Sequence, residues 1–297
     1  FVTNIGEVSN KGFDFQLGGT IIKNDNFSWN SDFNISFINN KVKKLPGGND
    51  IQQTERYLFG GVVSILREGE SLGSFYLYES NGVFSTAKEA AEAGYIDKIS
   101  KSNGGQPVAG DARWVDQNKD GVIDTKDKII AGNPIPDFTG GLNNTFKYKG
   151  LSLDAFFQFS KGNDVYNNFR TDLVRGFNTN YLKENLDAWK QEGDITDVPR
   201  NVLLDPANNS EGVVARPSTR FLEDGSFIKL KTVTLTYEFP NSVLEKLKLS
   251  GLKVYAKGTN LLTITKYSGF DPEVSVAQNN NAGQNGGFQF GIDRGLY

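Results

Sequence analysis

Residues 27–37, FSWNSDFNISF, separate into two chemistries when every second position is taken. The odd-numbered positions carry Phe, Trp or Ile, with Ser31 as the exception, and the even-numbered positions carry only Ser, Asn and Asp. A period of two is the period of a β-strand, so this stretch predicts a strand with one apolar and one polar face. The apolar face needs an apolar medium, which is either a protein core or lipid hydrocarbon.

The composition excludes several kinds of chemistry. The 297 residues include no Cys, His or Met, so the chain can build neither a Cys/His zinc site nor a Ser-His-Asp triad. A net charge of −3 gives no signal for nucleic acid binding. The absence of long apolar runs argues against membrane helices but not against membrane strands. Because strand-like sequence follows Phe1 at once, we expect an internal or C-terminal piece of a longer protein.

Three strand pairs are predicted from the same alternation, each joined by a short connection. The pairs are 13–21 with 27–37, 138–148 with 151–160, and 226–239 with 252–262. The first two connections are polar turns of a few residues. The third, residues 240–251, is predicted as one short helix with Leu244 and Leu247 packed inward.

The connections between the pairs are long, in contrast with the turns inside them. Residues 39–137, 161–225 and 263 onward are polar and rich in Gly, Asn and Asp, with helical composition at 86–94 and 181–193. Connections in compact domains run to about 4–6 residues. Outer-membrane barrels instead combine short periplasmic turns with long extracellular loops. The alternation of short and long connections therefore favours a barrel.

Strand length and side-chain chemistry favour the same architecture. The alternation continues through all of residues 27–37, and a tilted strand needs about 9–11 residues to cross the hydrocarbon layer. The polar face carries mostly small polar side chains, as suits a hydrated lumen. Phe27, Trp29 and Tyr148 lie beside the short turns, where an aromatic girdle is expected. The alternative is a large soluble β-sandwich whose aromatic side chains fill its own core.

Five segments resemble, in family order, the C-terminal third of the SusC/RagA family of TonB-dependent outer-membrane transporters of Bacteroidetes. They are EVSNKGFDFQL (7–17), the stretch 110–160 that begins GDARWVDQNKDG, TRFLEDGSFIKLKTVTLTYEFP (219–240), LKVYAKGTNLLTITKYSGFDPE (252–273) and GIDRGLY (291–297). The resemblance implies an all-β fold, an antiparallel transmembrane β-barrel of 22 strands with an N-terminal plug, in the cell outer membrane. It also implies a SusD-like surface lipoprotein as partner, and import of oligosaccharides or oligopeptides with energy delivered through TonB.

Some parts of that family are expected to lie outside this chain. The plug and the TonB box would precede Phe1, and the family continues past Tyr297 into one last strand with a terminal aromatic residue. An open sheet edge cannot remain in lipid, so residues 1–297 are interpreted as the C-terminal portion of a larger barrel. Residues 39–137 and 161–225 are then two of its long extracellular loops.

The stretch DQNKDGVIDTKD (116–127) has the spacing of an EF-hand-like calcium loop. Gly121 at loop position 6 permits the sharp turn, and Ile123 at position 8 would pack beneath the loop. Position 12 is Asp127 where an EF-hand has Glu, which resembles the dockerin-type variant. The predicted oxygen ligands are Asp116, Asn118, Asp120, Val122 through its backbone carbonyl, Asp124 and Asp127. The alternative is a plain turn with solvated charges, and a bound Ca²⁺ is expected to be structural.

Other stretches give weaker candidates for a site. Glu223 and Asp224 are adjacent in an extended segment, so they face opposite ways and make a poor acid/base pair. The stretch NDVYNNF (163–169) has aromatic and amide groups suited to sugar or peptide, with ordinary loop packing as the alternative. Trp114 and Trp189 are interpreted as loop anchors. Since no spaced acid pair or nucleophile–base set is found, no enzyme activity is predicted, and the substrate-contacting residues are unknown.

The sequence thus favours a SusC-like nutrient importer that contacts lipid, a SusD-like lipoprotein, TonB and an oligosaccharide or oligopeptide. The second hypothesis, from a different class, is a soluble extracellular glycan-binding or adhesion β-protein with a dockerin-like calcium loop. The two hypotheses differ in what covers the aromatic face of residues 27–37.

Overall fold

The structure, a computed structural model, describes residues 6–54, 62–100, 102–174, 181–202, 210–211, 214–273 and 292–293. Most of the segment 291–297, which contributes to the family resemblance, lies outside the described residues, as do parts of the predicted long connections.

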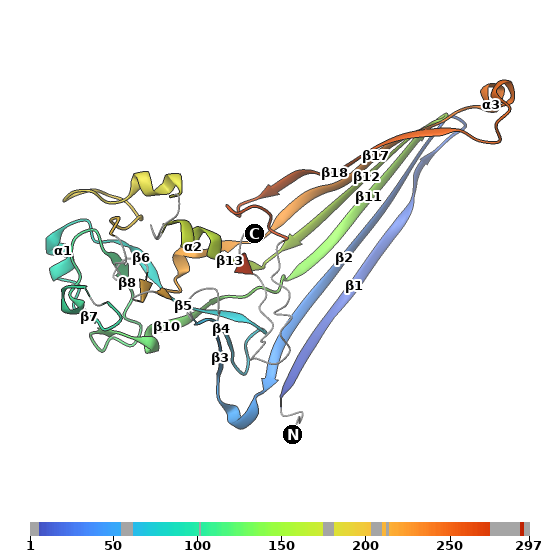
Figure 1. Cartoon of the computed structure of the whole chain (residues 1–297). Helices are drawn as coiled ribbons and strands as arrows, with labels where there is room; N and C mark the ends of the chain where they lie inside the picture. Colours follow the sequence, from blue (N-terminus) through green and yellow to red (C-terminus); the bar gives the residue numbers. More distant parts are fainter. Residues whose placement is uncertain are drawn as a thin grey trace.

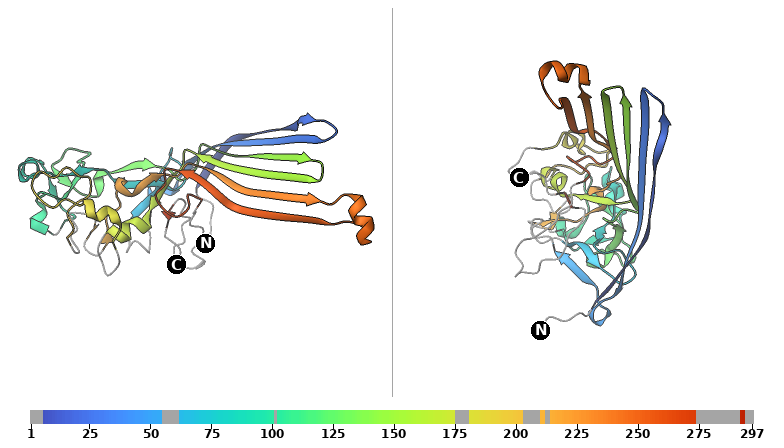
Figure 2. Two further views of the ribbon diagram at one scale, coloured as in Figure 1. Left: turned by 90° about the horizontal axis from the view of Figure 1, so that it is seen from above. Right: turned by 90° about the vertical axis from the view of Figure 1, so that its right-hand side faces the viewer.

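A single layer of six antiparallel strands extends away from a folded body (Figures 1 and 2). In their order across the sheet, the strands are β1 (Glu7–Lys23), β2 (Phe27–Lys44), β11 (Phe138–Tyr148), β12 (Leu151–Lys161), β17 (Phe227–Glu238) and β18 (Lys253–Thr265). The three predicted strand pairs are therefore confirmed as hairpins. Their short connections lie at the end of the sheet far from the body, and the long connections lie at the near end.

The first hairpin is longer than the alternation alone predicted. β1 begins at Glu7 and β2 continues to Lys44, and their register pairs Val8 with Val42 near the body. Beyond residue 37 the alternation of β2 is lost because Asn40 and Val42 are both buried against the body. A strand that leaves one environment for another keeps its backbone pairing while its side-chain pattern changes.

The third short connection forms α3 (Asn241–Leu247), as predicted, at the far tip of the sheet. Leu244 is buried, but Leu247 is 53% exposed, so the prediction that both leucines pack inward is wrong for Leu247. A helix of two turns beside a single-layered sheet has little surface against which to pack a second side chain. Lys248, with φ +55°, ends the helix in the left-handed conformation.

The long connections fold together into the body. The connection from β2 to β11 forms η1 (Pro46–Gly48), β3 (Ile51–Thr54), β4 (Val62–Leu66), β5 (Ser74–Tyr78), β6 (Ser80–Val83), α1 (Ala87–Ala91), β7 (Ile96–Asp97), η3 (Ser102–Gly105), β8 (Ala112–Trp114), β9 (Val122–Ile123), η4 (Thr125–Asp127) and β10 (Lys128–Gly132). The connection from β12 to β17 forms β13 (Asp164–Asn167), α2 (Asn168–Val174), η5 (Lys183–Asp187), β14 (Ser210–Glu211), β15 (Val214–Ala215), η6 (Thr219–Phe221) and β16 (Leu222–Asp224). β19 (Ile292–Asp293) pairs in parallel with β13.

Two apolar clusters hold the body together, and the polar composition of the connections did not predict them. The first joins both connections and comprises Val63, Phe75, Leu77, Tyr166, Val174 and Phe221. The second comprises Tyr78, Phe84, Ala90, Tyr95, Ala112, Trp114 and Ile123. Of the two segments with helical composition, 86–94 contains α1, whereas 181–193 contains only the 3₁₀ turn η5. None of the helices in the described ranges is long and apolar enough to cross a membrane.

Candidate functional site

The apolar face of the six-stranded sheet is largely open. Register places Leu17, Phe33 and Leu142 side by side across β1, β2 and β11, and the same row continues through Phe157, Leu230 and Leu262. Exposed fractions reach 65% at Leu17 and 53% at Leu262. Within the described ranges no second sheet covers this face, which contradicts the sandwich alternative. An apolar surface of this extent marks contact with another apolar medium.

Aromatic rings on this face stack on one another across neighbouring strands. The ring centroids of Phe13 and Phe37 are 4.8 Å apart, and those of Trp29 and Phe146 are 5.6 Å apart. Trp29 also donates its indole N–H to Asn144 at 2.9 Å, so its polar atom is satisfied within the sheet. Phe27 pairs directly with Tyr148 at the far end. The predicted aromatic positions beside the short turns are therefore gathered in one band.

The opposite face of the sheet is polar and internally hydrogen-bonded. The Thr20 hydroxyl donates to Asn30 at 2.6 Å, and the Thr145 hydroxyl donates to Asp154 at 2.7 Å. These four residues form one row across β1, β2, β11 and β12. Polar side chains can bond one another along such rows while remaining accessible to water, as the lining of a hydrated passage requires.

The polar face ends, next to the body, in a cluster of charges. Lys229 lies in the polar row with Gln158 and has no exposed side-chain surface. Its ammonium contacts both carboxylate oxygens of Asp271, at 2.7 and 2.8 Å, and the carboxylate of Glu273. Lys231 also pairs with Glu273. Residues 266–273, which follow β18 and are named the strap below, therefore fold back over the polar side of β17.

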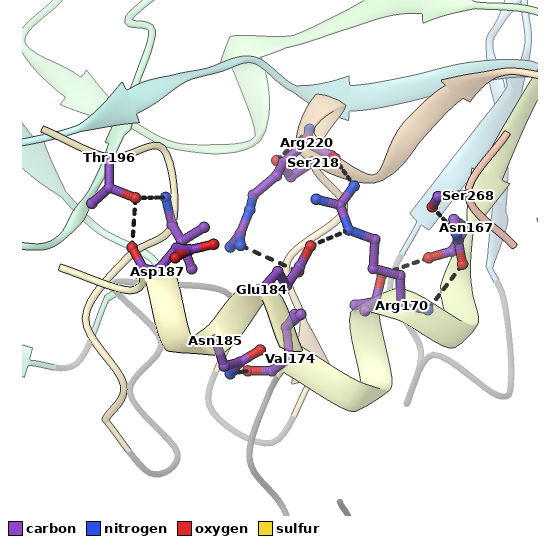
Figure 3. A network of polar contacts seen from close by, with 12 residues as sticks. Asn167, Arg170, Val174, Glu184, Asn185, Asp187, Thr196, Ser218, Arg220 and Ser268 are labelled. Carbon is purple, nitrogen blue, oxygen red and sulfur yellow. Dashed lines mark hydrogen bonds and ion pairs between the residues drawn. The ribbon is translucent and has the colours of Figure 1, made fainter. Parts of the chain in front are cut away.

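The other end of the strap is tied into the body. The Ser268 backbone N–H and hydroxyl donate to the two oxygens of Glu223, at 2.7 and 2.8 Å. Arg170 donates to the same carboxylate at 3.2 Å. It also donates to Glu184 at 2.8 Å (Figure 3). Through these shared carboxylates, polar contacts run without a break from the strap to α2 and η5.

The network around Glu184 contains two arginines. Arg220 lies 3.6 Å from Glu184, beside Arg170, and burial lowers the pKa of its guanidinium to about 10 (Figure 3). At neutral pH Arg220 remains charged, because that pKa is still well above 7. Two half-buried cations, Arg170 and Arg220, share the carboxylates of Glu184 and Glu223 in one network of ion pairs.

The predicted calcium loop is closed by its own hydrogen bonds. Asp116 accepts the backbone N–H groups of Lys119 and Gly121, at 2.7 and 2.8 Å. The buried carboxylate of Asp127 accepts the backbone N–H of Gln117 at 3.0 Å and of Asp124 at 2.8 Å, so it joins the two halves of the loop. In the described part of the chain, no three acidic, His or Cys side chains are grouped so as to hold a metal ion.

The remaining predicted ligands lie in the same loop. Asn118 accepts from the Asp120 N–H at 2.9 Å, Asp120 accepts from the Val122 N–H at 3.0 Å, and Asp124 accepts from the Lys126 N–H at 2.8 Å. Gly121 has φ +78°, the left-handed conformation that loop position 6 requires. Ile123 is fully buried in the second apolar cluster, as predicted. These residue types are ones that an oxygen-preferring cation takes as ligands. Among the residues that the structure describes, however, the carboxylates bond the backbone of the loop itself and are not grouped around one point.

Other predicted features also have definite positions. The stretch 163–169 is packed into the body, as the alternative of ordinary loop packing predicted. Its buried residues include Val165, Tyr166, Asn167 and Asn168. Trp114 is buried in the second cluster, and Trp189 donates its indole N–H to the Ser85 carbonyl at 3.0 Å. Both tryptophans are therefore anchors. Glu223 and Asp224 have different partners, since Asp224 accepts from Lys161 and the Ser226 N–H.

Sequence reasoning missed the charge cluster and the arginine network. Lys229 and Lys231 do interrupt a strand whose polar face otherwise carries Thr residues as far as Glu238 at its end, and this was a usable signal. The stretch DPE (271–273) was the second signal, since it supplies two carboxylates on one short turn. Lys229 and Asp271 are 42 positions apart in the chain and meet only because of the path that the strap takes. The alternation of side chains along a strand does not predict that path.

No family model matches the chain. Over its whole length it is 36% identical to TonB-dependent receptor P3 of Formosa agariphila. Over 91% of its length it is 27% identical to TonB-dependent receptor SusC of Bacteroides thetaiotaomicron. The chain spans 28% and 24% of the lengths of these two relatives.

Solved structures agree with these relatives. The structure of the RagAB peptide transporter matches 91% of the chain with a TM-score of 0.68 and 29% identity. The RagAB peptide importer in its closed-closed state matches 98% with a TM-score of 0.67 and 29% identity. The chain covers 27% and 29% of those two chains.

The single-layered sheet, its two chemically distinct faces and its structural similarity to RagA define a segment of a transmembrane β-barrel of the TonB-dependent class. The chain belongs to the SusC/RagA family of TonB-dependent receptors.

Proposed function

We propose that the protein to which this chain belongs imports an oligomeric nutrient across the bacterial outer membrane, in partnership with a SusD-like surface lipoprotein. The observation that carries the proposal is the uncovered apolar face, which shares one sheet with a polar, hydrogen-bonded face. The apolar face contacts lipid, and the polar face lines part of the passage. The body built from the two long connections lies on the extracellular side, where a lipoprotein and the nutrient reach it.

The energy for uptake has to come from elsewhere. A hydrogen-bonded wall lowers the barrier to passage but supplies no work against a gradient. We therefore assign energy transfer to TonB, acting through other parts of the receptor, and no catalytic role to this region.

The test uses the full-length receptor in its own outer membrane. Deleting the receptor should abolish growth on the nutrient oligomer, and affinity purification of the tagged receptor should recover a lipoprotein encoded beside it. Growth on the monomeric nutrient should be unchanged, because small molecules enter by other routes. Unimpaired growth of the deletion strain on every oligomer that the wild type uses would refute the proposal.

We also propose that residues 116–127 bind Ca²⁺ and that the ion stabilises the body. The residues that would hold it are Asp116, Asn118, Asp120, Val122, Asp124 and Asp127. The chemistry of these groups supports the assignment, because Ca²⁺ prefers carboxylate, amide and carbonyl oxygen. Asp127 is buried, which places the loop against the folded body rather than in free solvent.

The calcium proposal predicts a chelator effect in the full-length receptor. Cleavage of residues 110–130 by protease should speed up when a calcium chelator is added, and Asp116→Ala combined with Asp120→Ala should have fast cleavage without chelator. The strands should stay protected throughout, since the loop lies outside the sheet. Identical cleavage of the wild type with and without chelator would exclude the ion.

A further inference from the structure

The apolar face of the first hairpin becomes basic at the end of the sheet next to the body. Phe13 and Phe37 pair directly in register with stacked rings, and they are the last aromatic residues of the hairpin before that end. On the same face, Lys11 is the next residue in β1, and Lys41 lies four residues beyond Phe37 in β2. At about 3.3 Å per residue, Lys11 is about 7 Å and Lys41 about 13 Å from the aromatic pair along the strands.

The side chains of these two lysines face away from the body. Lys41 lies between Asn40 and Val42, whose side chains are 7% and 1% exposed because both pack against the body. Neighbouring residues of a strand face opposite ways, so Lys41 faces outward. Asn10, the neighbour of Lys11, accepts a hydrogen bond from the amide of Asn40 and therefore lies on the body side. Both lysines thus continue the apolar face and not the polar one.

This end of the hairpin carries an excess of positive charge. Residues 7–12 and 38–44 contain four lysines and a single carboxylate, that of Glu7, whereas the whole chain has a net charge of −3. Lys11 and Lys41 are exposed. Among the residues with described positions, neither ammonium group has a carboxylate within ion-pair distance. Their charge is therefore available to an anion outside the chain.

The two ammonium groups can act together on one anion. Lys11 lies opposite Asn39, and Lys41 is two residues further along β2, so the two lysines are diagonal neighbours across the strand pair. Diagonal neighbours in an antiparallel pair are about 7–8 Å apart. A lysine side chain is a flexible stem of four carbons that ends in three hydrogen-bond donors. Both ammonium groups can therefore reach a single phosphate group, whose oxygens accept charge-assisted hydrogen bonds.

The position of this basic surface matches the headgroup region of a membrane. Aromatic side chains gather at the boundary between hydrocarbon and water, and lysines beside that boundary extend their ammonium groups to the headgroups. Attraction of lysines to anionic lipids falls off within a Debye length, so it acts only close to the membrane surface. In the proposed orientation the body is extracellular, and the outer leaflet of a bacterial outer membrane contains a glycolipid with phosphate groups on its sugars.

We infer that Lys11 and Lys41 bind phosphate groups of this glycolipid, lipopolysaccharide, while Phe13 and Phe37 contact its acyl chains. The inference rests on the proposed function, which places the body outside the cell. It adds a ligand that is not transported, because the lipid binds to the outer wall of the barrel. Such a lipid would hold the hairpin whose second strand leads into the first long connection.

The experiment titrates the purified full-length receptor in detergent with fluorescently labelled lipid A, the phosphorylated lipid portion of the glycolipid. Lys11→Gln combined with Lys41→Gln should weaken binding by about tenfold or more, because each lysine contributes to the attraction of anionic lipid. Lys11→Arg combined with Lys41→Arg keeps both charges and should stay within about threefold of the wild type. Lys246→Gln combined with Lys248→Gln is the matched control and should bind like the wild type, since both lysines are exposed at the far tip of the sheet.

Thermal unfolding without lipid A separates loss of contact from misfolding, and all variants should match the wild type there. Equal lipid A binding by the wild type and the double Gln variant at Lys11 and Lys41 would overturn the inference. Equal binding of lipid A and its dephosphorylated form by the wild type would also overturn it. Tighter binding of phosphatidylglycerol than of lipid A would overturn the assignment to the outer leaflet.

The competing occupant of this surface is the acidic surface of a protein. Loss of the co-purified lipoprotein in the double Gln variant, with lipid A binding unchanged, would assign the surface to that protein and overturn the lipid site. The import function itself is tested separately, by growth of the deletion strain.

Discussion

Phe33 and Asn34 are neighbours in β2, yet their side chains lie on opposite faces of the sheet. Phe33 pairs with Leu17 and Leu142, and its ring centroid is 6.1 Å from that of Phe159. Asn34 pairs with Gln16 and Gly141 in the polar row. Adjacent residues of one strand therefore lie in the two different environments of the sheet. Substituting each of them in turn tests directly which face contacts lipid.

Arginine at the two positions should have unequal effects. Phe33→Arg should cost about 2–4 kcal/mol of folding free energy in a bilayer, because a charge would face hydrocarbon. Asn34→Arg should cost under about 1 kcal/mol, because the side chain would face the hydrated side. Urea unfolding of the full-length receptor in lipid vesicles measures both. Equal losses would show that the faces are assigned wrongly.

Asp127 gives a second residue-scale prediction, in the body. Asp127→Ala would leave the N–H groups of Gln117 and Asp124 without their acceptor inside a buried site. Lost hydrogen bonds to a charged group cost about 1.5–3 kcal/mol. Hydrogen exchange at residues 116–127 should therefore be much faster in Asp127→Ala than in the wild type. The increase should be much smaller in Asp120→Ala, because the side chain of Asp120 is exposed. Similar acceleration in both variants would mean that Asp127 does not join the loop.

At the scale of elements, α3 and the strap differ in what stabilises them. α3 is held to the tip of the sheet through one buried leucine, whereas the strap is held by ion pairs and hydrogen bonds. Sequence periodicity located every strand of the main sheet because burial or lipid contact follows the backbone there. It failed for Leu247 and for the ion cluster because both depend on which distant surface the chain meets.

The two leucines of α3 form a matched pair. Leu244→Ala should lower stability by about 2 kcal/mol, at the lower end for a buried leucine because the site is only partly enclosed. Leu247→Ala should change it by less than about 0.5 kcal/mol, since that side chain is 53% exposed. Protease cleavage in residues 240–251 reports the difference, and a larger effect at Leu247 would contradict the packing.

Acid should release the strap. Burial raises the pKa of the Asp271 and Glu273 carboxyl groups, but the Lys229 ammonium outweighs burial, so both pKa values lie below their ordinary 3.8 and 4.5. A carboxyl group whose pKa is lower in the folded than in the unfolded state stabilises the fold at pH values above its unfolded-state pKa. That stabilisation is lost as the pH falls through the folded-state pKa. Hydrogen exchange of residues 266–273, corrected for its intrinsic pH dependence, should be flat above about pH 5 and rise below about pH 4. In Asp271→Asn with Glu273→Gln this rise should vanish, and a rise that persisted would exclude the ion pairs as its cause.

At the scale of the whole molecule, the chain divides into a sheet without a core of its own and a body with two cores (Figure 1). Hairpin order, strand positions and the contrast between the two faces could be predicted from residues 27–37 and their counterparts. The folded body could not, because its apolar residues are scattered through polar sequence and meet only after both long connections come together. Tyr166 and Phe75 illustrate this, with centroids 6.4 Å apart and 91 positions between them in the chain.

The central claim is that the odd-numbered side chains of residues 27–37 contact lipid. Residues 1–297 contain no Cys, so once any cysteines elsewhere in the full-length receptor are replaced, single cysteines at positions 32 to 37 can each carry a nitroxide spin label in that receptor, reconstituted in lipid vesicles. Oxygen concentrates in hydrocarbon and a nickel chelate stays in water. We predict that collisions with oxygen dominate at Phe33, Ile35 and Phe37, and collisions with the chelate at Asp32, Asn34 and Ser36. Loss of this alternation, or low access of both reagents at the odd positions, would contradict it.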